Sequence, residues 1–204
     1  MKLWNKNMLF IVLAVLTIAI PMNASAYVPY YYKMIGGISP GLYDNNATPY
    51  NYYGQMFYMD YVAESAFTAW GVATTKANLI NADSYGATGT IKVRSYSDNY
   101  GNIDLYGWAE MYNSNNVRVN GYRGASGPSS NYNTGSIYLN VYDMAESSLN
   151  FSQMKAVAIH ELGHIWGLDH QRNGTASVMN DITYISNGWL TPQSDDINGV
   201  NNIN

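Results

Sequence analysis

The sequence predicts an α+β domain in which strands and two long helices alternate along the chain. Residues 58–75 place apolar side chains at the spacing of one helix face, and residues 150–167 open with a helix-capping pattern. Between them, residues 91–96, 105–112 and 136–141 have the patterning of half-buried strands. The chain shows no internal repeat and no linker long enough to divide it into two domains.

The two long helices are predicted from different features. The apolar positions of the first helix are Tyr61, Val62, Phe67 and Trp70. In the second helix, Asn150 is the expected N-cap, and Gln153 three residues later completes a capping box. The helix should run to about Gly167, because a residue without Cβ can adopt positive φ and end it.

The remaining segments are predicted from turn and cap residues. Thr191 is the expected N-cap of a C-terminal helix, with Pro192 at the first helical position. Residues 27–43 should include a short opening strand. Residues 113–133 form a Gly/Asn/Ser-rich loop region with room for one short strand at 117–120.

Tyrosine is frequent, with 20 among 204 residues, and it clusters at residues 30–32 and 52–53. One interpretation is an adhesive surface that faces a cell wall or glycans. The other is a set of half-buried strand residues, which we favour because tyrosine fits a pleated, half-buried surface.

All three histidines of the chain lie within eleven residues. His160, Glu161, His164, Gly167 and His170 form the pattern H-E-x-x-H-x-x-G-x-x-H. On a helix, the first two histidines stand one turn apart on one face, so both imidazoles can reach one metal ion at about 2.0–2.1 Å. The glycine allows the chain to turn back, so that the third histidine reaches the same ion. This pattern is the zinc-binding signature of a large group of metallopeptidases, the metzincins.

The composition of this site favours catalysis over a structural role. Three neutral imidazoles leave Zn²⁺ one open position, whereas structural sites close with four protein ligands. Glu161, next to the first ligand, would take a proton from the attacking water. The alternatives are ordinary core histidines or a zinc-binding pseudoenzyme, and the intact glutamate argues against both.

The resemblance to metzincins continues beyond the motif. Residues 177–179 resemble the Met-turn, which implies that Met179 is an apolar floor beneath the zinc ligands and not itself a ligand. Residues 190–200 are similar to the last helix of the matrixin branch. Upstream, residues 66–72 and 90–94 resemble the first long helix of matrixins and the strand after it.

The resemblance implies a zincin-like catalytic domain: a mixed twisted sheet, two long helices and a C-terminal helix, with one catalytic zinc in a cleft. It further implies that an antiparallel edge strand, nominated as residues 105–111, pairs with the substrate backbone. The nominated substrate-binding residues are Leu105, Tyr106, Gly107, Trp108 and Ala109 on this strand, and Ile182, Tyr184 and Ile185 after the Met-turn.

Some positions depart from the family pattern. Gln171 follows the third histidine, where matrixins usually carry serine. Asp181 stands where matrixins usually carry proline and where astacins and serralysins carry a tyrosine, so it argues against the latter two branches. Calcium is a second candidate ion, in the loop 97–104, since carboxylate and carbonyl oxygens suit it. Solvated turn acids are the alternative interpretation of that loop.

The first 26 residues have the features of an export signal. Lys2 and Lys6 precede an apolar run at residues 8–20, and Ala24 and Ala26 fit a cleavage site. Such a run is too short to span a bilayer, so we expect a secreted domain of residues 27–204 without a stable membrane anchor.

Charge and cysteine content narrow the function further. A formal net charge of −4 without a basic cluster disfavours nucleic-acid binding. Zero cysteines in an exported chain is typical of secreted bacterial proteins. We therefore expect a secreted, monomeric zinc endopeptidase that acts on proteins or peptides. The alternatives are a non-catalytic surface- or matrix-binding protein and a zinc amidase acting on cell-wall peptide.

Overall fold

The computed structural model describes residues 27–181 and 183–204, and the expected export signal (1–26) and Ile182 lie outside them. Its centre is a five-stranded mixed sheet in the order β4-β1-β5-β7-β6, in which only the edge strand β6 is antiparallel to its neighbour. The strands are β1 (Leu42–Asn45), β4 (Ile80–Asn81), β5 (Ile91–Asp98), β6 (Gly107–Tyr112) and β7 (Thr134–Asn140). The predicted strands at 91–96, 105–112 and 136–141 correspond to β5, β6 and β7.

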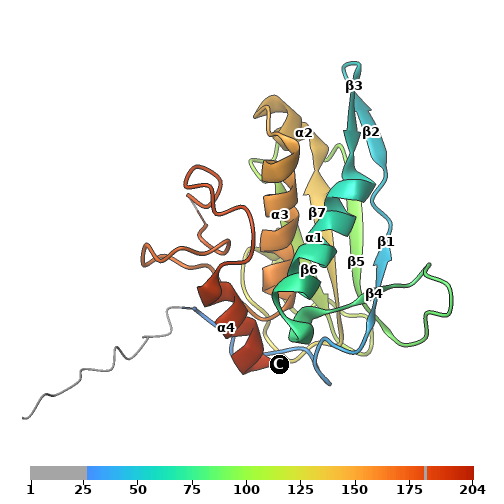
Figure 1. Ribbon diagram of the computed structural model, residues 1–204, viewed down its shortest axis with the longest axis vertical. Coiled ribbons are helices and arrows are strands. Elements are labelled where there is room, and N and C mark those ends of the chain that lie inside the picture. Colours follow the sequence, from blue (N-terminus) through green and yellow to red (C-terminus); the bar gives the residue numbers. More distant parts are fainter. Residues whose placement is uncertain (1–26, 182) are drawn as a thin grey trace, which may run out of the picture.

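Two long helices, α1 (Met59–Ala73) and α3 (Phe151–Ile165), lie side by side and cover one face of the sheet (Figure 1). They enclose a continuous apolar core with the sheet, and the Trp70 side chain donates from Nε1 to the Ile159 carbonyl at 3.0 Å across the helix pair. A short helix α2 (Val141–Glu146) follows β7, and α4 (Ser194–Ile203) closes the chain. This is the α+β arrangement of the metzincin fold.

The predicted capping box of α3 is confirmed. The Asn150 side chain accepts from the Gln153 amide at 3.1 Å, and the Gln153 side chain accepts from the Asn150 amide at 2.9 Å. The backbone amides of the N-cap Asn150 and of Gln153 in the first turn therefore both have hydrogen-bond partners within the protein. The helix ends at Ile165, two residues before the predicted glycine.

The prediction for the C-terminal helix was wrong at its start. Gln193, not Thr191, is the N-cap of α4, and the helix begins at Ser194, after Pro192. The reason is Asp196, whose carboxylate accepts from the Gln193 amide at 2.8 Å and so sets the register of the cap. The Thr191–Pro192 pattern does not indicate the hydrogen bond between the Gln193 amide and Asp196, which determines where the helix begins.

The N-terminal part also differs from expectation. The opening strand β1 lies beyond most of the predicted range 27–43, whose earlier residues make only isolated bridges. A hairpin of β2 (Pro49–Tyr52) and β3 (Gln55–Tyr58) extends from the top of the molecule (Figure 1). The strand expected at 117–120 is reduced to a bridge between Tyr112 and Arg118.

Neighbouring tyrosines of one cluster differ in burial, according to their position in the fold. Tyr52 lies half-buried on β2, as the strand interpretation requires, whereas Tyr53 at the hairpin tip and Tyr31 are each 93% exposed. Tyr61, predicted to be apolar core, is 63% exposed on the outer face of α1, where it contacts Phe151. The other three predicted core positions of that helix are buried. No helix within residues 27–181 and 183–204 is long and apolar enough to cross a membrane.

Candidate active site

The metal-binding face of α3 is buried and its imidazoles are fixed by backbone carbonyls. His160 and His164 lie on one side of the helix, one turn apart, and each is less than 8% exposed. The Nδ1 atom of His160 is 2.7 Å from the Val178 carbonyl, and that of His164 is 2.9 Å from the Leu168 carbonyl. A carbonyl can only accept, so both Nδ1 atoms carry the proton and both Nε2 atoms present lone pairs.

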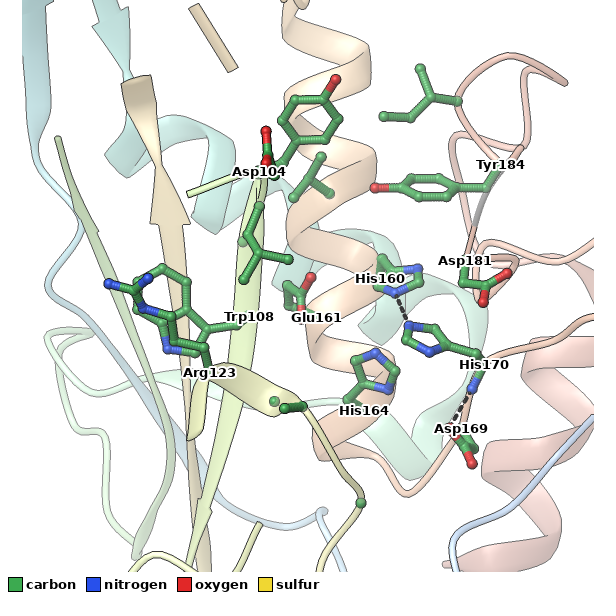
Figure 2. A pocket seen from close by; sticks show the side chains of 18 of the residues that line it. Asp104, Trp108, Arg123, His160, Glu161, His164, Asp169, His170, Asp181 and Tyr184 are labelled. Atoms are coloured by element: carbon green, nitrogen blue, oxygen red, sulfur yellow. Dashed lines mark hydrogen bonds between the residues drawn. The ribbon is translucent and has the colours of Figure 1, made fainter. Parts of the chain in front are cut away.

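The turn after α3 brings the third histidine back to the helix. Gly167 has φ +101°, its amide donates to the His164 carbonyl at 3.0 Å, and the Leu168 amide donates to the Gly163 carbonyl at 3.0 Å. This pair of bonds is a Schellman motif, which requires the left-handed conformation that glycine adopts without strain. As a result, His170 Nε2 lies 3.2 Å from His160 Nε2 (Figure 2).

The three histidines fit a zinc ion. One ligand nitrogen of each can be chosen so that all lie within 4.8 Å of one another, and among the described residues no other such group of His, Cys, Asp or Glu occurs. Two nitrogens at 2.0–2.1 Å from one tetrahedral ion stand about 3.3 Å apart, close to the His160–His170 separation. Burial lowers the pKa of His160 to about 3 and also lowers the pKa of His164 and His170. All three are therefore neutral near pH 7, as metal ligands must be.

Met179 lies directly under this helix face. It is 2% exposed, and a Cβ added to Gly163 would fall 2.2 Å from its sulfur, so the glycine is what lets the Met-turn approach. The Asp196 carboxylate holds the turn from α4: it accepts from the Val178 amide at 2.9 Å and from the Ser177 hydroxyl. Asp196 thus caps α4 and anchors the Met-turn, a double role that its place near the helix start does not reveal.

Glu161 points into the same cleft, on the side of α3 that faces strand β6 (Figure 2). It is 7% exposed, and burial raises its pKa to about 8. A Cβ on Gly107 would lie 2.9 Å from the Tyr138 carbonyl oxygen, which excludes a side chain, and 3.2 Å from the Glu161 Cγ, so this strand passes close to Glu161. The carboxyl therefore lies between the histidines and the edge strand.

The edge strand forms the opposite wall of a cleft of about 1150 Å³. Asn140 donates its amide N–H to the Tyr106 carbonyl, so Tyr106 and Trp108 direct their backbone groups toward β7. In an antiparallel ladder, the backbone N–H and C=O groups of the alternate residues Gly107 and Ala109 then point to the open edge of the sheet. All of the nominated edge residues except Ala109 line the cleft.

Part of this edge is already occupied. The Asn120 side chain donates to the Ala109 carbonyl at 2.8 Å and accepts from the Met111 amide at 2.9 Å. The stretch open to an incoming peptide is consequently short and centred on Gly107. Asn120 lies in the predicted loop region, and no sequence signal linked it to the cleft.

The loop before β6 does not support the calcium hypothesis. Asn140, fully buried, donates from Nδ2 to the carbonyls of Gly101 and Leu105 at 2.9 and 3.1 Å. The Asp143 carboxylate accepts from the amides of Ile103 and Leu105 at 3.3 and 3.1 Å. A side-chain amide therefore holds the carbonyl oxygens that would surround a cation, and no metal-binding group of acids forms in this loop.

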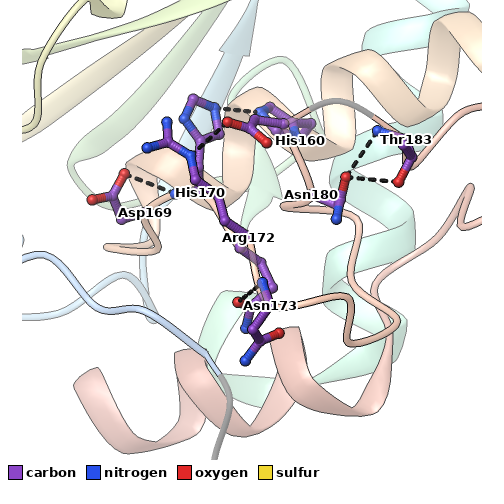
Figure 3. A network of polar contacts seen from close by, with 9 residues as sticks. His160, Asp169, His170, Arg172, Asn173, Asn180 and Thr183 are labelled. Atoms are coloured by element: carbon purple, nitrogen blue, oxygen red, sulfur yellow. Dashed lines mark hydrogen bonds and ion pairs between the residues drawn. The ribbon is translucent and has the colours of Figure 1, made fainter.

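The residues after the Met-turn form the other wall of the cleft. Tyr184 is 9% exposed and stacks on His160 with ring centroids 4.9 Å apart, and Ile185 lies beside it in the cleft lining. Ile182, nominated with them, lies outside the described residues. Figure 3 shows the polar side of this loop, where Arg172 donates to the Asp181 carboxylate at 2.7 Å next to His170.

One contact of the site was not predicted at all. The Tyr30 hydroxyl lies 3.0 Å from His164 Nδ1, although the two residues are 134 positions apart. The sequence marked Tyr30 only as a member of a tyrosine cluster. No local pattern can report a contact across the whole chain.

The family comparison agrees with this geometry. The sequence profile of the matrixin peptidases matches residues 51–204, and the chain belongs to the matrixin family. No curated protein matches the chain. Among solved structures, the GM1-bound form of the ECX AB5 holotoxin is similar over 88% of each chain, with 11% identity and a TM-score of 0.49.

Proposed function

We propose that this matrixin is a secreted zinc endopeptidase in which Glu161 is the general base. The observation that carries the proposal is the shared cleft: three neutral imidazoles and one buried carboxylate face a strand edge with free backbone groups. Zinc, when bound, lowers the pKa of a water molecule to about 7 and polarises the substrate carbonyl. Matrixin membership supports zinc-dependent peptide hydrolysis as the reaction class.

Three residues would then have separate roles in this reaction. Glu161, in the ionised form that a neighbouring divalent cation would favour, accepts the proton of the attacking water and delivers it to the amine that leaves. The backbone of Gly107 pairs with an extended peptide as an added strand, which holds the scissile bond between the edge strand and α3. Asn120 limits that pairing, because the Ala109 carbonyl and the Met111 amide are already bonded to its side chain.

The side-chain pocket next to the histidines is proposed to accept an apolar residue just after the scissile bond. The support for this is that four residues of the cleft lining are apolar or aromatic: Leu149, Val157, Tyr184 and Ile185. A cleavage profile on a peptide library, with cell-wall peptides as a separate arm, tests this preference and the substrate class. An acidic or basic preference at that position contradicts the pocket assignment.

Glu161→Gln is the decisive variant, because it keeps size and hydrogen bonding but cannot accept the proton. Zinc content should stay at one per chain while peptide hydrolysis falls by about 10²–10⁴-fold. Glu146→Gln is the matched control, because the Glu146 carboxylate accepts a hydrogen bond from Tyr52 away from the cleft. This variant should hydrolyse peptides at the wild-type rate. Wild-type hydrolysis by Glu161→Gln, or by zinc-free protein, contradicts the proposed function.

Export is proposed from the sequence features of residues 1–26. Protein recovered from the culture medium of an expressing bacterium should begin at Tyr27. A chain that stays in the cells with its first 26 residues intact contradicts secretion, without bearing on the hydrolysis test.

A further inference from the structure

The segment that follows the expected cleavage site is paired to the turn that carries the third histidine. Pro29 forms an antiparallel bridge with Leu168. The Tyr30 amide donates to the Gly167 carbonyl at 2.7 Å, and the Asp169 amide donates to the Val28 carbonyl at 2.7 Å. Residues 28–30 therefore act as a strap along residues 167–169, immediately before His170.

The strap also places a hydroxyl on a metal ligand. The Tyr30 ring lies over the His164 ring at 6.0 Å between centroids, with 29° between planes, and its hydroxyl lies 3.0 Å from His164 Nδ1. The loop at Gly127 covers the tyrosine, since a Cβ there would fall 2.7 Å from the Tyr30 ring. The ring is thus held from two sides with its hydroxyl directed at the histidine.

We propose that Tyr30 is a positioning residue for the zinc ligand His164, so that the N-terminal strap is part of the metal site. The inference rests on the proposed zinc function. His164 Nδ1 carries one proton and has two acceptors around it, the Leu168 carbonyl at 2.9 Å and the Tyr30 hydroxyl oxygen at 3.0 Å. Two acceptors fix the tautomer and the ring orientation more firmly than one, and they direct Nε2 toward the other two histidines.

The neighbouring tyrosine shows that the contact is specific to one position. Tyr31 is 93% exposed and its ring contacts that of Tyr32, whereas the hydroxyl of Tyr30 has His164 as its hydrogen-bond partner. Packing against the Gly127 loop needs the ring of Tyr30 but not its oxygen. Removing only the hydroxyl oxygen of Tyr30 therefore tests its effect on His164 while the packing of the ring is kept.

The test is Tyr30→Phe, with Tyr31→Phe as the matched control, both in the mature chain. Loss of an outer partner of a metal ligand typically costs 10–100-fold in metal affinity. We expect about a 10-fold loss in Tyr30→Phe, at the low end because the Leu168 carbonyl remains. Zinc affinity is measured by competition with a chromogenic chelator, and the visible spectrum of the cobalt-substituted protein reports the ligand geometry.

Four outcomes are distinguishable. A weaker zinc affinity and an altered cobalt spectrum in Tyr30→Phe, with the metal-free melting temperature unchanged, support the proposal. Affinity and spectrum equal to those of Tyr31→Phe overturn it, as does a loss of affinity fully matched by a loss of metal-free stability. Failure of the wild-type chain to bind zinc overturns the proposed function instead, so the two failures cannot be confused.

Discussion

The two walls of the cleft are built in different ways. On the wall formed by α3 and the Met-turn, the carbonyls that fix the two helical histidines lie 4 and 18 residues away from them. On the wall formed by β6, the preceding loop is held by Asn140 and Asp143, which lie 35 to 40 residues away from the groups they bond. Apart from the contact of Tyr30 with His164, the first wall is built from residues close in the sequence, whereas the second depends on the assembled sheet.

Under the proposed function, this difference assigns metal binding to one wall and substrate binding to the other. The histidine wall needs one helix, one glycine turn, one loop and the N-terminal strap, and none of these belongs to the strand wall. We therefore expect zinc binding to persist when the strand wall is disturbed. In the proposed function, the strand wall contributes backbone groups that bind the substrate, and the metal ligands all lie on the histidine wall. Perturbing each wall in turn should therefore change one property at a time.

The largest effect is expected from Asn140→Ala, on the strand wall. The substitution removes the bonds to Gly101 and Leu105 and the cap of α2 at Tyr142, at a cost of about 2–4 kcal/mol in the free energy of unfolding. Displacement of β6 should lower kcat/KM by roughly 10- to 100-fold. Zinc content should not change.

Urea unfolding, zinc analysis and peptide hydrolysis measure the three quantities. Asn102→Ala is the control, because Asn102 is exposed in the same loop. If Asn140→Ala is as stable and as active as this control, the strand wall does not depend on the buried amide. If it loses zinc, the two walls are not independent.

A smaller effect is expected from Gly163→Ala, on the histidine wall. In an unobstructed helix this change would stabilise by about 0.5–1 kcal/mol. Here the new Cβ meets the Met179 sulfur, and overpacking of this kind costs about 1–3 kcal/mol. The variant should be destabilised and should release zinc faster, and thermal melting and chelator competition give the two values.

The double variant Gly163→Ala/Met179→Ala identifies the cause. If the collision is responsible, its destabilisation is less than the sum of the two single changes, because the clashing sulfur is gone. Strict additivity, or a Gly163→Ala protein more stable than the wild type, would show that the helix and the Met-turn are not in tight contact.

Calcium should have the smallest effect, because an amide and backbone bonds already organise the strand wall. A site filled at 100 times its dissociation constant stabilises by about 2.7 kcal/mol, which raises the melting temperature by more than about 5 °C in a chain of this size. We expect a change below about 1 °C between calcium and a calcium chelator in zinc-loaded protein. A calcium-dependent rise of the melting temperature by more than about 5 °C would show that the protein binds calcium and would contradict this expectation.

The sequence alone determined the parts of this protein that are local. The histidine spacing, Gly167 and the Asn150–Gln153 box each act within a few residues, so helix geometry and backbone stereochemistry specify them wherever the chain folds. The strands β5, β6 and β7 were predicted for the same reason, because alternation along a strand is a short-range pattern. The family was recognisable from these features, and its profile matches residues 51–204.

Tertiary structure decided what joins distant segments. Asn140 donates to carbonyls of the loop in which calcium was expected, Asp196 sets the start of α4, and Tyr30 contacts His164 across 134 positions. Each is a polar side chain whose partner becomes available only after burial removes water as the competing partner. Such side chains look alike in sequence whether they are solvated or buried, and only the packed fold distinguishes the two.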